Sequence, residues 1–149
     1  MLKKSLNKFL KIDPISIIRE ILSDRAILTW IQDKNKEQLK KGLNSEDVKL
    51  SDIGGEYSAV TLDLKPNKVA DRVDLYDTGD FYESIIAKAG VEDLVEFDAN
   101  PIKIEEDGDR INLYNRWGKD IIGLNEEDLQ ELIEKVKVKL IAEIRRQVC

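Results

Sequence analysis

The last part of the sequence places the strongest constraint on the fold. Apolar residues recur there at three- and four-residue spacing and form one helical stripe, made of Leu129, Leu132, Ile133, Val136, Leu140, Ile144 and Val148. Asn125 is a suitable N-cap, and Glu126, Glu127 and Asp128 after it complement the helix dipole. We therefore predict a long closing helix whose apolar face packs against other elements.

A helix is also predicted near the start of the chain. Asp13 can cap it, because Pro14 follows at the first helical position, where proline is favoured. Ser23-Asp24 can restart this helix, and its apolar stripe then extends to Leu39 and ends at Gly42, a residue typical of helix C-termini.

The middle of the sequence alternates between apolar and polar residues with a period of two, which is typical of strands. Residues 57–65 predict a half-buried strand with Val60, Leu62 and Leu64 on one face, and residues 73–75 predict a brief one. Residues 95–99 and 102–104 predict a hairpin across Asn100-Pro101.

Two short helices are expected between and after these strands. Asp77 is the predicted cap of the first, which should end before Gly90, and the second should end at Gly118. Their apolar residues are Phe81, Ile85, Ile86 and Ala89 in the first helix, and Leu113, Tyr114 and Trp117 in the second.

These elements predict an α+β fold, with a small antiparallel sheet and an embedded short helix, flanked by an N-terminal helix and a long C-terminal helix. The 149 residues, 42% of them hydrophobic, are enough for one core. We therefore expect a single α+β domain over residues 13–149, preceded by a basic amphipathic N-terminal arm over residues 1–12.

The arm carries candidate subunit contacts at helical spacing, namely Leu2, Leu6, Phe9 and Leu10. Lysines interrupt its apolar residues, so it does not match the core of a signal peptide, and the sequence has no stretch typical of a transmembrane span. The arm could bind an anionic membrane surface or dock on its own domain or a neighbouring subunit. We favour docking, and expect no membrane partner.

The composition limits the chemistry that the chain can perform. It contains no histidine and only one cysteine, Cys149, which argues against histidine-based hydrolysis, zinc binding and an internal disulfide, and favours a reducing compartment. A net charge of −6 argues against a protein that grips DNA, although an acidic wall could let DNA pass without sticking. We expect no cofactor.

Acidic and aromatic residues offer weaker candidates for binding sites. Asp74, Asp77 and Asp80, or Asp93, Glu96 and Asp98, could hold a cation, but neither run has the pattern of an ion-binding loop, so we interpret both as solvated surface. Trp30 and Trp117 could stack on bases, but their spacing favours core or subunit contacts.

Asp77-Thr78-Gly79 is also the triplet of two-chain aspartic proteases, in which aspartates from both subunits share a proton. Ile121-Ile122-Gly123 resembles the segment that supports the catalytic loop of the retroviral type. Such enzymes consist almost entirely of strands, whereas this sequence predicts helices after the triplet and at the end of the chain. We therefore expect no enzyme and keep the protease as an alternative.

Four blocks of the sequence form motifs in a fixed order. The central one is Val73-Asp74-Leu75-x-Asp77-Thr78-Gly79-x-Phe81-x-x-Ser84. Upstream lie Asn35-x-x-Gln38-Leu39-x-x-Gly42 and Gly55-x-Tyr57-Ser58-x-x-Thr61-x-x-x-Lys65, and downstream lies Trp117-Gly118-x-x-Ile121-x-Gly123-Leu124. These blocks resemble those of the small tail-completion, or minor tail, proteins of tailed bacteriophages. The chain departs from the family after Gly42, where a second glycine is missing from the following turn.

The resemblance implies a structural role for Asp77, Thr78, Gly79, Phe81 and Ser84, and no catalytic residue or metal ligand carries over. It implies a ring-forming virion protein at the head–tail junction or upper tail, made in the host bacterial cytoplasm. Its partners would be copies of itself around the tail axis, the connector and the tail-tube protein, with DNA passing at most. A cytosolic binding module is a further alternative.

Overall fold

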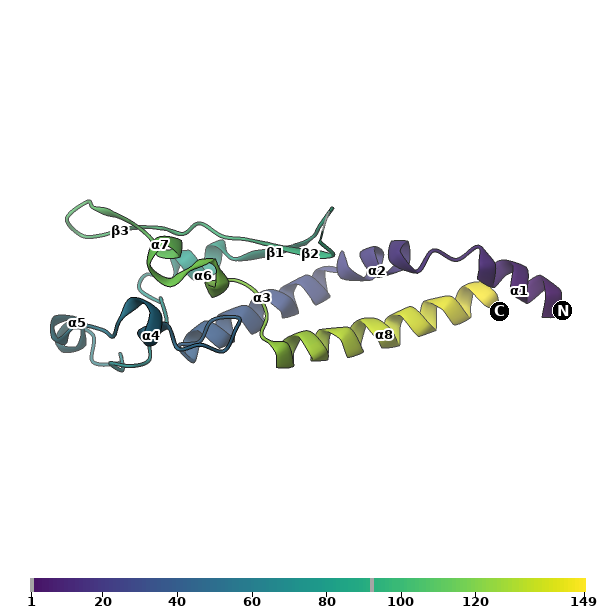
Figure 1. The fold of residues 1–149 in the computed structure, drawn as a ribbon. Coiled ribbons are helices and arrows are strands. Elements are labelled where there is room, and N and C mark those ends of the chain that lie inside the picture. Colours follow the sequence, from purple (N-terminus) through teal and green to yellow (C-terminus); the bar gives the residue numbers. More distant parts are fainter. Residues whose placement is uncertain (1, 92) are drawn as a thin grey trace.

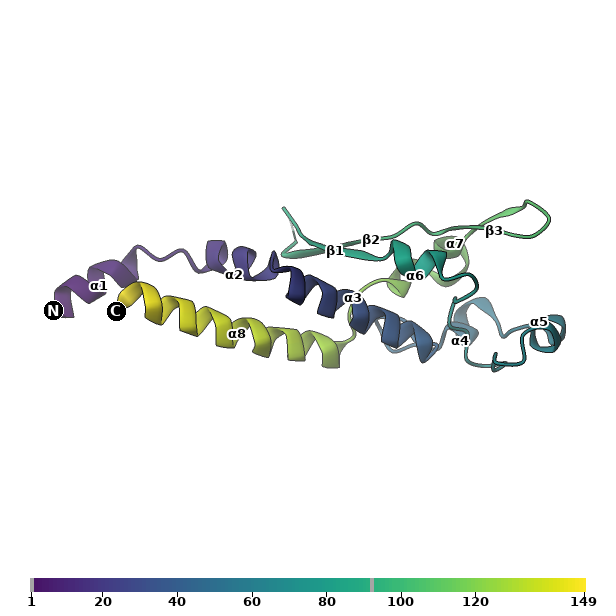
Figure 2. The same cartoon turned by 180° about the vertical axis from the view of Figure 1, so that it is seen from behind.

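The computed structural model describes residues 2–91 and 93–149, and the molecule is elongated, as Figure 1 shows. Its long axis is formed by α1 (Leu2–Leu10), α2 (Pro14–Leu22), α3 (Arg25–Lys40) and α8 (Glu126–Val148). Helix α8 runs back along α3 and α2, so that its C-terminal end lies beside α1 (Figures 1 and 2). The predicted long closing helix is thus confirmed.

The predicted ends of α2 and α3 are confirmed by their capping hydrogen bonds. The Asp13 carboxylate accepts from the Ile15 and Ser16 N–H groups, and the Asp24 carboxylate accepts from the Ala26 N–H. Beyond α3, Gly42 takes a positive φ of 75°, and its N–H donates to the Leu39 carbonyl at 2.8 Å. This left-handed turn ends the helix as glycine at this position predicts.

The turn after α3 is built without the second glycine expected from the resemblance. Asp47 takes a φ of 58° there, a conformation that favours glycine. Asn44, whose side chain is buried, accepts at Oδ1 from the N–H groups of Glu46 and Val48. The side chain of Asn44 therefore holds the loop in shape.

Strands occur as two separate hairpins in the described residues. In the first, β1 (Ile86–Ala89) pairs antiparallel with β2 (Val95–Asp98). In the second, β3 (Ile102–Ile104) pairs antiparallel with β4 (Arg110–Asn112). The predicted hairpin across Asn100-Pro101 is wrong, because the runs on its two sides pair with different partners.

The prediction of one helix from Asp77 to Gly90 is also wrong in its second half. Helix α6 (Asp80–Ser84) is short, and the residues after it form β1. The Ser84 hydroxyl donates to the Phe81 carbonyl at 2.7 Å and accepts from the Asn100 N–H at 2.9 Å. Ser84 thus closes α6 and ties it to the chain that leaves β2.

The predicted strands at residues 57–65 and 73–75 are wrong. Residues 59–64 form α5 (Ala59–Leu64), which Ser58 caps by accepting from the Thr61 N–H at 3.2 Å. Val60 and Leu64 are four residues apart, so the apolar pattern of this short run fits one helix face as well as a strand. Leu75 has a φ of 57°, which is incompatible with an extended strand.

The remaining elements gather around a core at one end of the molecule. They are α4 (Leu50–Gly54), α7 (Leu113–Trp117) and a 3₁₀-helix, η1 (Lys119–Ile121). The core contains Leu39, Leu50, Val73, Phe81, Tyr82, Ile85, Leu113, Trp117, Ile121 and Ile122. The helix predicted to end at Gly118 is therefore confirmed as α7, with Trp117 in the core.

A second core joins α2, α3, β1 and α8, and it contains Leu22, Ile27, Ile31, Ala87 and Leu132. The α+β class is confirmed, with helices as 55% of the chain and strands as 12%. The two hairpins replace the single small sheet that we expected. None of the described helices is both long and apolar enough to cross a membrane.

Candidate functional site

The sequence motif around Asp77 forms a corner between an irregular segment and α6. Gly79, not Asp77, is the N-cap of α6, with a φ of 94°, and the Thr78 hydroxyl accepts from the Asp80 N–H at 3.3 Å. The prediction that Asp77 caps the helix is therefore wrong. A Cβ atom at Gly79 would lie 3.1 Å from the Tyr76 hydroxyl, so both φ and space favour glycine here.

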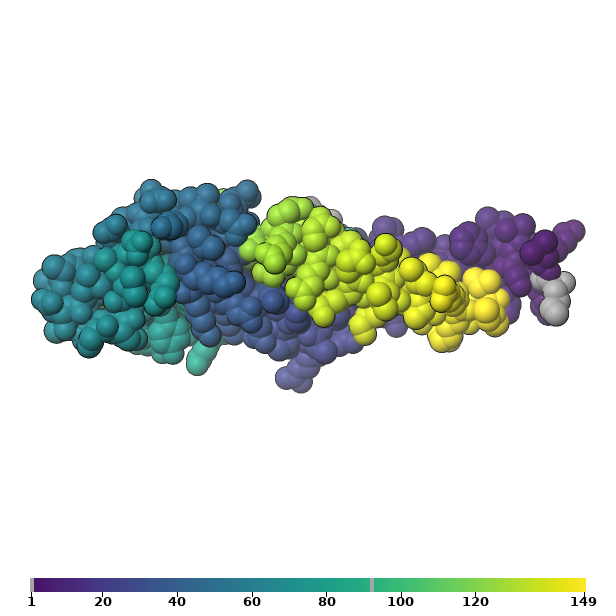
Figure 3. Space-filling model, turned by 90° about the horizontal axis from the view of Figure 1, so that it is seen from below, coloured from purple at the N-terminus to yellow at the C-terminus, as the bar shows by residue number. Residues whose placement is uncertain are grey.

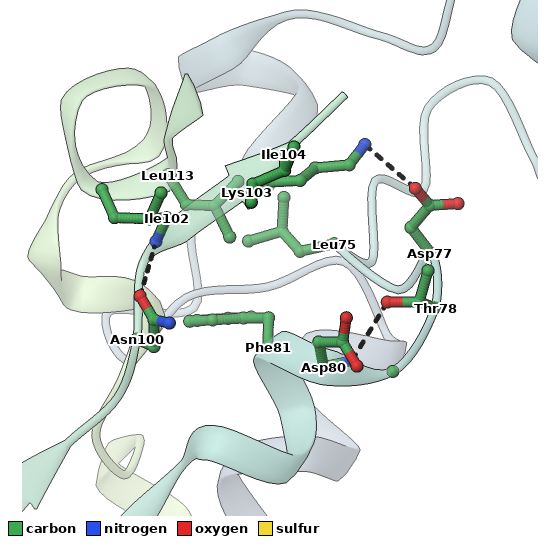
Figure 4. Close-up of a pocket in the computed structure, with 11 residues that line it drawn as sticks. Leu75, Asp77, Thr78, Asp80, Phe81, Asn100, Ile102, Lys103, Ile104 and Leu113 are labelled. Carbon is green, nitrogen blue, oxygen red and sulfur yellow. Dashed lines mark hydrogen bonds and ion pairs between the residues drawn. The ribbon is translucent and has the colours of Figure 1, made fainter. Parts of the chain in front are cut away.

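Asp77 instead forms ion pairs with two lysines from other parts of the chain. Its carboxylate pairs with Lys65 after α5. It also pairs at 3.2 Å with Lys103 of β3, as Figure 4 shows. The hydrogen bond from Lys65 is the main reason that the pKa of Asp77 lies below its usual value, and Lys103 adds to it against the opposing effect of burial. The corner is thus tied to α5 and to the second hairpin.

This electrostatic environment is the reverse of that in an aspartic protease dyad. A shared proton requires one carboxyl group whose pKa is raised by a second carboxylate nearby. The pKa of Asp77 is lowered, and its carboxylate oxygens are engaged by lysines. The Asp77-Thr78-Gly79 triplet also leads directly into α6.

Asp74 lies at the centre of a hydrogen-bond network that the sequence did not predict. Its Oδ1 accepts from the Tyr57 hydroxyl at 2.8 Å and the Tyr76 N–H at 3.0 Å, and pairs with Lys68 at 2.6 Å. The Tyr82 hydroxyl donates to the Asp74 carbonyl at 2.6 Å. The network therefore ties Tyr57, which lies between α4 and α5, to the segment before α6.

Burial and hydrogen bonding both act on the ionisable groups of this network. Burial alone would raise the pKa of Asp74, but hydrogen bonds from Lys68, the Tyr76 N–H and Tyr57 outweigh it, and the pKa is lowered. Burial raises the pKa of Tyr57 and Tyr82 above the usual value for tyrosine. Asp74 is therefore an ionised acceptor and the two hydroxyl groups are neutral donors over the ordinary pH range.

Beside the corner lies a hollow of about 330 Å³ (Figure 4). Leu75 and Phe81 face it from the corner, and Ile102 and Leu113 face it from the second hairpin and α7. Lys103 and Asp77 pair with each other at its edge. The charges of these two side chains therefore neutralise each other.

The structure bears on the candidate cation sites and on the two tryptophans that could stack on bases. The described residues contain no group of three or more histidine, cysteine, aspartate or glutamate side chains that could hold a metal ion. Trp117 is buried in the core, as predicted. Trp30 is half-buried, and the ammonium groups of Lys34 and Lys135 lie 5.7 Å and 5.2 Å from the centre of its ring.

An apolar groove runs between α2, β2 and α8, with a volume of about 520 Å³. Helix α2 contributes Ile18 and Leu22, and the first hairpin contributes Leu94, Val95 and Phe97. The largest share comes from α8, namely Leu129, Leu132, Ile133, Val136, Lys137 and Leu140. Lys137 is the one charged residue among the described residues that line the groove.

The apolar stripe of α8 is only partly covered. Leu132 is the one buried residue of α8, all of which is described, and Leu129 and Ile133 are 40% and 46% exposed. The sequence predicted a stripe that packs against other elements, but α2 and α3 cover only part of it. Figure 3 shows α8 lying along the outside of the molecule.

The predicted arm forms α1, with Met1 outside the described residues. Leu2, Leu6, Phe9 and Leu10 are all more than half exposed. The structure places α1 beside the C-terminal end of α8, as Figure 3 also shows, and leaves the apolar face of α1 open. The four residues proposed as subunit contacts are thus available on one helix face.

Comparison with protein-family models, with curated proteins and with solved structures finds no match to this chain.

Proposed function

We propose that this chain is a structural subunit that assembles with copies of itself into a ring, as a tail-completion or head–tail connector component of a tailed bacteriophage. The observation that carries the proposal is the uncovered apolar surface along α1 and α8. The motif resemblance in the sequence supports the phage role, and the connector and tail-tube proteins would be its neighbours in the virion.

Large contiguous apolar surfaces are unusual on a protein that works alone in water. Here α1 exposes its apolar face at one end of a long molecule, and the N-terminal half of α8, which lies nearer the middle, exposes Leu129 and Ile133. Burial of such surface stabilises an assembly by about 25 cal/mol per Å², before the costs of association are subtracted. The exposed faces therefore favour an assembly subunit over a monomeric binding module.

The charges around Asp77 support a structural role for the motif. A retroviral-type protease would need Asp77 to approach its copy across a two-fold axis, with a proton shared between the two carboxyl groups. The ion pairs with Lys65 and Lys103 oppose that arrangement. In the proposed subunit, the same ion pairs hold the corner against α5 and β3.

The mass of the protein in solution tests the proposal. We expect light scattering after gel filtration, together with native mass spectrometry, to detect a closed oligomer whose population grows with concentration. Negative-stain electron microscopy should then show rings, and the chain should be detected in purified phage particles. A chain that stays monomeric at all concentrations and is missing from particles would contradict the proposed function.

A further inference from the structure

We propose that α1 of one copy docks in the apolar groove of the next copy, along the N-terminal half of α8. This inference rests on the proposed assembly function and assigns the contact that builds the assembly. The occupant of the groove is thus a second copy of this chain.

The chemistry of the groove fits an apolar helix face. Sites for small molecules combine apolar walls with a few polar groups that converge on the ligand. In this groove, the lining described above is apolar apart from Lys137. Leucine and phenylalanine side chains are suitable occupants, and α1 presents these residue types on one exposed face.

The lengths of the groove and of α1 also agree. Helix α1 has nine residues, which at 1.5 Å per residue gives a length of about 14 Å. The groove follows α8 from Leu129 to Leu140, a distance of about 16 Å along the helix. One α1 helix can therefore occupy most of the length of the groove.

Charge complementarity favours docking at the N-terminal half of α8. Helix α1 contains Lys3, Lys4 and Lys8 and no acidic residue. Residues 126–134 of α8 contain acidic residues and no basic one, namely Glu126, Glu127, Asp128, Glu131 and Glu134. Residues three and four apart are neighbours on a helix, so Glu126 lies beside the exposed Leu129.

Within its own chain, α1 lies beside the opposite end of α8. Residues 135–148 contain Lys135, Lys137, Lys139, Arg145 and Arg146 against one acidic residue, Glu143. Basic α1 thus lies at the basic end of α8 and leaves its apolar face exposed. Docking on a second copy would bury that face and place the lysines near carboxylates, which gives the contact its specificity.

The contact joins two different surfaces, so it is heterologous. Every copy then offers one arm and one groove, and repetition of the contact gives a ring if the rotation closes. A contact of this kind supplies the geometry that the proposed ring requires.

Two full-length variants test the contact. Leu6→Glu with Phe9→Glu alters the arm, and Leu129→Glu with Ile133→Glu alters the groove; all four residues are at least 40% exposed, so the fold should tolerate the changes. The matched controls are Asn7→Glu, on the polar side of α1, and Val138→Glu, an exposed position outside the groove. Circular dichroism checks that each variant is folded.

Light scattering and native mass spectrometry should find each double variant monomeric on its own, while both controls assemble like the unaltered chain. An equimolar mixture of the two variants should form a species of twice the 17.1 kDa monomer mass, because the intact arm of one can dock in the intact groove of the other. This heterodimer cannot extend further, since its remaining arm and groove are the altered ones.

Each other outcome contradicts the inference in a different way. Assembly that survives in both double variants would overturn the arm-in-groove contact but leave the proposed ring. Two monomeric variants that form no heterodimer would overturn the contact, because an intact arm and an intact groove would then have failed to pair. An unaltered chain that stays monomeric would overturn both the contact and the proposed function.

Discussion

Asn35 and Gly123 are joined by a partly buried hydrogen bond, in which the Gly123 N–H donates to Asn35 Oδ1 at 3.1 Å across 88 positions of sequence. The Asn35 Nδ2 group donates to the Ile121 carbonyl at 3.0 Å, and one helical turn later Gln38 Oε1 accepts from the Asn125 N–H at 3.1 Å. Asn35 is fully buried. These bonds fix the segment before α8, and so determine where α8 begins along α3.

Asn35→Leu should therefore destabilise the fold. The substitution leaves the Ile121 carbonyl and the Gly123 N–H without their partner in a buried site, a loss of about 1–3 kcal/mol. Urea unfolding followed by circular dichroism would measure the change. Asn115→Leu, at an exposed position of α7, is the control and should change stability by no more than about 0.5 kcal/mol. An equal effect at both positions would contradict the assigned role of Asn35.

Gly54→Ala should destabilise the packing of α4 on α7. A Cβ atom at Gly54 would lie 2.3 Å from Trp117 Nε1, a separation that the buried indole cannot accommodate without moving. Overpacking of this kind costs about 1–3 kcal/mol. The thermal unfolding midpoint should fall accordingly. In a Trp117→Phe background the same substitution should cost less, because the smaller ring gives space; a cost that stays equal in both backgrounds would exclude this clash as the cause.

Stability should decrease in acid because of Asp74. Its pKa in the folded protein lies below the usual value for an aspartate, because hydrogen bonds from Lys68, the Tyr76 N–H and Tyr57 outweigh burial, so the folded state favours the ionised carboxylate. The stabilisation is present above the unfolded pKa and is lost as the pH falls from about 4 through the lower folded pKa. Asp74→Asn should flatten the fall in urea midpoint between about pH 5 and pH 3. Asp63→Asn, at an exposed position of α5, is the control and should leave the curve unchanged.

The helices with clear end signals could be predicted from the sequence. Asp13, Asp24 and Asn125 each accept the capping hydrogen bond that their positions implied. These signals are local, since cap and helix lie within a few residues of each other. The bounds of α2, α3 and α8 follow from them.

The strands and the corner depended on partners that the sequence does not reveal. Period-two alternation is short in residues 57–65, and Val60 and Leu64 also fit one face of a helix. Strand β1 forms because β2 pairs with it, although its residues also fitted a continued α6. Asp77 has a local pattern typical of a cap, but Lys65 and Lys103 bind its carboxylate from other elements.

Of the candidate functional surfaces, the apolar residues of the arm could be predicted from helical spacing, and α1 presents them as expected. The groove could not be predicted from the sequence, because it forms only where α2, β2 and α8 come together in the fold. The stripe on α8 was visible in the sequence, but nothing there indicated that Leu129 and Ile133 would remain exposed. Burial depends on how many elements reach a helix face, and this follows from the tertiary arrangement.

Duplex DNA should bind weakly at physiological salt. The net charge is −6, and the basic loop after α5 uses its lysines internally: Lys65 pairs with Asp77 and Lys68 with Asp74. Lys68 is almost fully buried, with 6% of its side chain exposed, so its charge cannot reach a phosphate. Phosphate contacts require free lysine and arginine side chains, because the release of counterions drives such binding.

Fluorescence anisotropy with a labelled duplex at about 0.15 M salt would measure this affinity. Asp77→Asn frees Lys65 and Lys103 from their shared partner, and should strengthen binding at low salt while leaving it weak at physiological salt. Submicromolar binding by the unaltered chain at physiological salt would contradict the prediction. It would then identify α1, whose lysines are exposed, as the first basic surface to alter.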